Sequence, residues 1–114
     1  MKSSFLAVAF FALSVQAYEG PSTETLLGAR ISRDAITIRV RSGGCTWKNS
    51  FHIRKQYDSA LKTTKLTFIR LQPDLCEGFF PEGRVLNYNR VELQIKADEG
   101  FSIGNPFAPS FERD

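Results

Sequence analysis

The sequence has few of the side chains that most often carry catalysis or bind metals. Its 114 residues include one histidine, His52, and only two cysteines, Cys45 and Cys76. Together these three side chains cannot supply the four ligands of a structural zinc site. A Cys-x-x-Cys pair is absent, and Gly43-Gly44 is a turn rather than a phosphate-binding loop. We therefore expect no catalytic residues, no metal site and no cofactor.

Long apolar runs are equally scarce. The one unbroken run, residues 5–13, is shorter than the roughly 20 residues that a membrane-spanning helix needs. It follows Lys2 and precedes the short residues of Ser14-Val15-Gln16-Ala17, an order typical of a secretory signal peptide. We predict a signal peptide over residues 1–17, cleaved after Ala17, and no transmembrane segment. The alternative is an N-terminal helix of the fold, which the breakers Gly20-Pro21 disfavour.

The excess of positive charge is small. The chain has 15 lysines and arginines against 12 aspartates and glutamates, and without Lys2 the counts are 14 and 12, a net charge of +2. A nucleic-acid-binding domain of this size usually has a larger and more clustered excess. We expect no nucleic-acid partner.

The 97 residues that would remain after cleavage suffice for one domain. We assign residues 18–25 to a flexible N-terminal segment, 26–108 to a single β domain and 109–114 to a C-terminal tail. An exported chain meets an oxidising compartment, so Cys45 and Cys76 are expected to form a disulfide. Its loop of about 30 residues would stabilise the domain by roughly 3–4 kcal/mol. Trp47 is expected to pack against it.

Apolar and polar residues alternate along several short segments, the pattern of half-buried β-strands. Clusters of glycine, proline, serine and aspartate separate these segments and are typical of turns. The sequence predicts an all-β domain, either a small antiparallel β-sandwich or a barrel of six to seven strands, and no helix after residue 17. The predicted strands are residues 36–41, 51–57, 65–71, 91–96 and 101–103, with weaker candidates at 26–31 and 84–88.

Basic side chains recur on the polar faces of these predicted strands. If the strands are neighbours in one sheet, the side chains form a positive stripe that suits an anionic partner such as an acidic glycan. The alternative is an ordinary solvated sheet face. The residues of this stripe are Arg39, Arg41, His52, Arg54 and Lys65.

The segment from Asp74 to Gly83 is the other candidate for partner binding. Phe79 and Phe80 follow Cys76 closely, and a disulfide-braced loop that displays aromatic rings loses little conformational entropy on binding. The alternative is that the rings fold back and cover the small core.

The same segment carries three carboxylates, Asp74, Glu77 and Glu82. Paired carboxylates can hydrolyse a substrate by acid–base chemistry, and three could bind calcium weakly. His52 lies on the polar face of a predicted strand and is interpreted as a surface residue.

These patterns favour a small exported, non-enzymatic β domain that binds a protein or an anionic partner in the periplasm or outside the cell. The partner-binding candidates are Phe79, Phe80, Arg39, Arg41 and Arg54. The alternatives are a small secreted hydrolase that uses the loop carboxylates, and a structural domain of the cell envelope.

Overall fold

The computed structural model describes residues 20–109. The predicted signal peptide lies outside these residues, as do residues 110–114 of the predicted tail. Within residues 20–109, no helix is long and apolar enough to cross a membrane.

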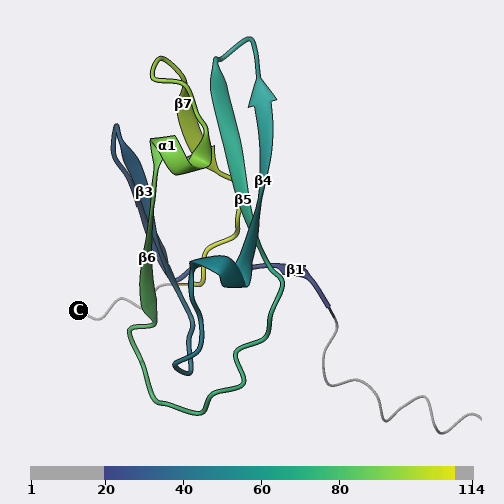
Figure 1. Ribbon diagram of the computed structural model, residues 1–114, viewed down its shortest axis with the longest axis vertical. Helices are drawn as coiled ribbons and strands as arrows, with labels where there is room; N and C mark the ends of the chain where they lie inside the picture. The colour runs from purple at the N-terminus through teal and green to yellow at the C-terminus, as the bar shows by residue number, and fades with distance from the viewer. Residues whose placement is uncertain (1–19, 110–114) are drawn as a thin grey trace, which may run out of the picture.

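The described residues form two β-sheets that face each other (Figure 1). The four-stranded sheet consists of β1 (Ser22–Thr23), β4 (Phe51–Asp58), β5 (Thr63–Arg70) and β7 (Gly100–Ile103). The three-stranded sheet consists of β2 (Gly28–Ile31), β3 (Ala35–Val40) and β6 (Arg84–Asn89). A 3-10 turn, η2 (Lys48–Ser50), precedes β4, and one helical turn, α1 (Arg90–Leu93), follows β6.

In the three-stranded sheet, β3 lies between β2 and β6 and pairs with both in antiparallel register. Ile36, Ile38 and Val40 are fully buried, while Thr37 and Arg39 face the outer side. The alternation seen in the sequence therefore corresponds directly to the two faces of the sheet.

In the four-stranded sheet, β5 is central and pairs with β4 along its whole length. Its other edge is shared, because β1 pairs with one end and β7 with the other. The buried side chain of Asn105 extends this edge: its amide accepts from Phe68 N (2.8 Å) and donates to Phe68 O (2.9 Å). One side chain thus replaces a backbone partner between the two short strands.

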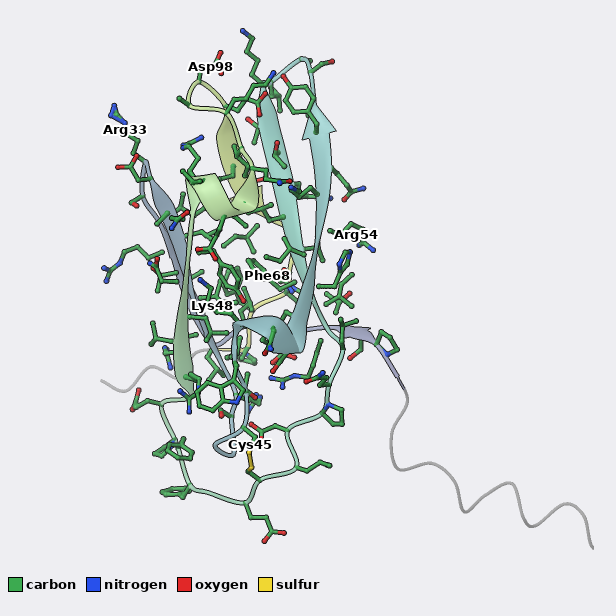
Figure 2. The ribbon with its side chains drawn as sticks, in the orientation of Figure 1. Arg33, Cys45, Lys48, Arg54, Phe68 and Asp98 are labelled. Atoms are coloured by element: carbon green, nitrogen blue, oxygen red, sulfur yellow. A yellow bond between two sulfur atoms is a disulfide. The ribbon has the colours of Figure 1, made fainter. Side chains whose placement is uncertain are left out.

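The core lies between the two sheets and receives apolar side chains from both. Phe68 of β5 and Tyr88 of β6 meet there with their ring centroids 5.2 Å apart. Figure 2 shows Phe68 in this space, with Arg54 on the outer side of β4. The prediction of a mostly β domain with two packed sheets is confirmed, and the barrel alternative is wrong because the strands do not close into a ring.

Two details of the predicted strands are wrong. Residues 91–96 do not form a strand, because Asn89 and Glu92 cap a helical turn there: the Asn89 side chain accepts from Glu92 N, and Glu92 Oε1 accepts from Asn89 N. The sheet is also not wholly antiparallel, since β7 runs parallel to β5. The chain between them passes through β6 and α1, and such a crossover allows the same direction.

The predicted flexible segment 18–25 includes β1, which the structure places in the four-stranded sheet. Glu24 directly after it pairs with Arg70 of β5 (2.9 Å). This end of the chain is therefore tied to the sheet from Ser22 onward.

Candidate functional site

The connection from β5 to β6, residues 71–83, crosses from one sheet to the other at one end of the molecule (Figure 1). We call it the crossing loop. It contains no helix or strand, and loops of this length without such elements are often functional. The segment after β3, residues 41–47, lies beside it and is joined to it by the disulfide.

Asp74 is the main anchor of the crossing loop. Its Oδ2 accepts hydrogen bonds from the hydroxyls of Ser42 (3.1 Å) and Thr46 (2.6 Å) and from the amides of Gly43 (2.9 Å) and Cys45 (3.0 Å). Its Oδ1 accepts from the amide of Cys76 (3.1 Å). Five donors thus converge on one carboxylate, which holds the crossing loop against residues 42–46.

These donors also decide the charge of Asp74. Partial desolvation would raise the pKa of the carboxyl, but the hydrogen bonds from Thr46 and from the three backbone amides outweigh it and hold the pKa far below its ordinary value of 3.8. Asp74 is therefore ionised at neutral pH and acts as a structural group. A carboxylate whose lone pairs are taken and whose pKa is lowered is a poor general acid.

The predicted disulfide between Cys45 and Cys76 is confirmed, with their Cα atoms 5.7 Å apart. Beside it, Gly78 N donates to Gly43 O (2.8 Å). A Cβ atom at Gly43 would lie 2.2 Å from Cys76 O, so only glycine allows the two segments to approach so closely. The two sulfurs and Asp74 form a cluster of metal-ligand types, but bonded sulfurs offer no thiolate.

A polar chain connects this anchor to the four-stranded sheet. The Thr46 hydroxyl that donates to Asp74 accepts from Arg70 Nη1 (3.0 Å), and Arg70 forms two 2.9 Å hydrogen bonds to the carboxylate of Glu24. The Arg70–Glu24 pair is largely shielded from solvent, and the Arg70 guanidinium stacks over the ring of Phe51 (4.9 Å). The crossing loop is thus joined to the sheet by side chains as well as by its own backbone.

The two phenylalanines of the crossing loop have different environments. Phe80 is 47% exposed and its ring lies over the backbone of Gly44 and Gly78, where a Cβ at Gly78 would come within 2.6 Å of it. Phe79 is 86% exposed, and Leu75 of the same loop is 82% exposed. Phe80 therefore packs on the loop, while Phe79 and Leu75 are displayed to solvent.

The structure does not bring the predicted basic stripe together. Arg39 and Arg41 belong to β3 and its continuation in the three-stranded sheet, whereas His52, Arg54 and Lys65 belong to β4 and β5. The prediction required that all these strands be neighbours in one sheet. They are not, so the predicted stripe is wrong. His52, Arg54 and Lys65 share one face, the outer face of the β4–β5 pair.

Arg41 instead joins the aromatic candidates. A shallow hollow of about 290 Å³ is lined by apolar side chains of the crossing loop and by Arg41. The lining residues are Leu27, Arg41, Ser42, Gly78, Phe79, Phe80 and Pro81. Three of the five predicted binding residues, Arg41, Phe79 and Phe80, thus meet at one site, with Arg39 bonded to the adjacent Leu27 O (3.3 Å).

Trp47 lies half exposed near this end, and the guanidinium of Arg84 stacks over its ring at 4.1 Å. The sequence predicts contact with the disulfide, whereas the ring contact in the structure is with Arg84. A cation–π pair between residues so distant in the sequence has no local signal that could reveal it.

The residues Gly100-Phe101-Ser102-Ile103-Gly104 have the G-x-S-x-G spacing of a nucleophile elbow. An elbow requires a sharp turn from strand to helix, but residues 100–103 form the extended strand β7. Along β5, Ser102 is opposite Lys65 and His52 is opposite Ile69, so the two are about 13 Å apart in the strand direction alone. Ser102 and His52 therefore do not form a Ser–His pair.

The chain matches no protein-family model, no curated protein and no solved structure. The interpretation of the site therefore rests on its own geometry.

Proposed function

We propose that this protein is a small exported binding protein that captures a protein partner with the crossing loop. The observation that carries the proposal is the display of Phe79 and Leu75 on a loop fixed by Asp74 and the disulfide. Exposed apolar side chains grouped on a braced loop are typical of interaction surfaces. The signal-peptide pattern of residues 1–17 and the disulfide support a secreted or periplasmic location.

The bracing explains why such a loop can bind. A mobile loop would lose conformational entropy when a partner ordered it, at a cost of about 1–2 kcal/mol for each residue whose backbone becomes fixed. Here the hydrogen bonds to Asp74 and the disulfide have already ordered residues 74–78 in the free protein. The apolar contacts of Phe79 and Leu75 are then available for affinity.

The two alternatives find less support at this site. A hydrolase that uses the loop carboxylates would need Asp74, whose oxygens already accept five hydrogen bonds, or Glu82, which lies 3.8 Å from Arg39. A purely structural domain would gain nothing from keeping Phe79 in water.

The test compares Phe79→Ala with Val91→Ala in the exported protein. Val91 is the matched control because it is 84% exposed on α1, away from the crossing loop. Both variants should keep the wild-type stability to within about 0.5 kcal/mol, as surface substitutions do. Only Phe79→Ala should weaken co-purification of partner from the culture supernatant or the cell envelope, by roughly 30-fold if Phe79 is an interface hot spot.

Two results would count against the proposal. One is a large loss of stability in Phe79→Ala, which would place the ring in the core. The other is equal capture by both variants.

A further inference from the structure

Arg41 differs from the other arginines at this end, because its side chain has no hydrogen bond, ion pair or ring contact with any of residues 20–109, whereas Arg84 stacks over Trp47. Arg39 donates to Glu82 O (3.0 Å) and Leu27 O (3.3 Å), and Arg70 is held by Glu24 and Thr46. The Arg41 side chain is exposed and has no hydrogen bond or ion pair with any described residue. Its backbone is fixed, however, because its carbonyl accepts from Arg70 Nη2 (3.2 Å).

The hollow beside Arg41 is lined by two chemically different kinds of group. Phe79, Phe80 and Leu27 contribute apolar groups to its lining, and Arg41 contributes a planar cation. Its volume of about 290 Å³ lies at the lower limit for small-ligand pockets, which corresponds to one bulky side chain rather than an extended ligand.

The shape of this hollow is set by glycine. A Cβ atom at Gly78 would lie 2.6 Å from the Phe80 ring and 2.8 Å from Gly43 O. At Gly83, a Cβ would lie 2.3 Å from Val40 O, and the residue has φ +75°, which glycine adopts without strain. Glycine at these two positions therefore lets the crossing loop lie close to residues 40–43.

We propose that the hollow recognises an acidic polypeptide segment in which a bulky apolar side chain lies next to a carboxylate. The apolar side chain packs against Phe79 and Phe80, and the carboxylate pairs with the guanidinium of Arg41. Arginine suits this role because its planar donors match the two oxygens of a carboxylate. This inference rests on the proposed binding function and names the chemistry of the partner.

A polypeptide fits this surface better than an anionic membrane does. Membrane-binding segments generally carry several basic residues, whereas the lining of this hollow includes one, Arg41. Glu77 and Glu82 are exposed in the same loop and would be repelled by anionic headgroups. A protein partner can place individual charges so that both glutamates stay in water.

The experiment uses two small probes and the protein that begins at residue 18. N-acetyl-phenylalanine carries a ring and a carboxylate, whereas N-acetyl-phenylalaninamide carries the ring alone. Titrated at millimolar concentrations, the first should shift the backbone amide signals of residues 41–44 and 78–83 in a saturable way. The amide probe should bind about 10-fold more weakly, because it lacks the charge that pairs with Arg41.

Variants of Arg41 test whether its guanidinium is the group that pairs with the carboxylate of the probe. Arg41→Gln should remove the preference for the carboxylate probe, and Arg41→Lys should retain part of it. Arg54→Gln is the control, because Arg54 is also exposed but lies on the outer side of the other sheet (Figure 2). Equal binding of both probes to the wild type, or an Arg41→Gln variant that keeps the preference, would overturn the proposal.

A third arm separates this inference from the binding function itself. One outcome is that the protein binds vesicles of phosphatidylcholine and phosphatidylglycerol through Phe79 but does not respond to the carboxylate probe. The partner would then be a membrane, and the proposed polypeptide would be wrong. If partner capture depends on Phe79 but neither probe binds, the role of Arg41 is wrong and the proposed binding function stands.

Discussion

At the scale of single residues, Asp74 organises the candidate site more than any other side chain. Four of its five donors lie 28 to 32 residues before it along the chain. Its bond to Cys76 N spans only two residues, the Asx-turn that Pro73-Asp74 already suggests in the sequence. The other four bonds depend on the tertiary position of residues 42–46.

We expect Asp74→Asn to destabilise the protein by about 1.5–3 kcal/mol at neutral pH, because an amide nitrogen would face donors and lose the charge that strengthens these bonds. Urea unfolding at pH 7 measures the effect. Asp98→Asn, at an exposed turn, is the control and should change stability by less than about 0.5 kcal/mol. A variant as stable as the wild type would contradict the anchoring role.

The difference in stability between the wild type and Asp74→Asn should also depend on pH. The folded pKa of Asp74 is depressed, so its contribution is complete above the ordinary value of 3.8 and is lost as the pH falls from there towards the folded pKa. The difference in unfolding free energy between the wild type and Asp74→Asn should therefore be constant from pH 7 to about pH 5. It should shrink on further acidification, and a gap that stays constant down to pH 2 would be inconsistent with the lowered pKa.

At the scale of elements, α1 shows how a local cap overrides a strand-like pattern. Val91, Leu93 and Ile95 alternate with polar residues, yet Leu93 and Ile95 are buried and Val91 is exposed from a helical turn. The hydrogen bond of Lys48 to Glu92 (2.7 Å) lowers the pKa of the Glu92 carboxyl and links η2 to this turn. The pattern Asn89-x-x-Glu92 is a capping-box signal that was available in the sequence.

Asn89→Ala should lower the free energy of unfolding by about 1 kcal/mol, because the amide of Glu92 loses its capping acceptor. Denaturant unfolding would measure this loss. Val91→Ala serves as the control in the same turn and should have little effect, since its side chain is exposed. If the two variants were equally stable, the cap would not hold the turn in solution.

At the scale of the whole molecule, the crossing loop connects the two sheets at one end. It leaves β5 in one sheet and enters β6 in the other, and the disulfide ties its centre to the segment that follows β3 (Figure 1). The sheets therefore share a covalent link near the candidate site in addition to their common core.

Replacement of both Cys45 and Cys76 by alanine should lower stability by roughly 3–4 kcal/mol, because the unfolded chain regains the freedom of a 31-residue separation. Thermal unfolding would show the loss as a lower midpoint. Partner capture should weaken as well, since the loop would be ordered less before binding. If the folded variant captured the partner as well as the wild type does, Asp74 alone would be enough to order the crossing loop.

The sequence by itself determined the period of most strands, the turns between them and the pairing of its two cysteines, because each depends on local patterns or on the count of residues. It could not reveal that Arg39 and Arg41 lie in a different sheet from Arg54, since strand order is set by long-range packing. Nor could it show that Phe80 covers glycines while Phe79 faces water. The scarcity of catalytic side chains narrowed the possible functions, but only the tertiary structure placed Arg41 beside the exposed apolar loop.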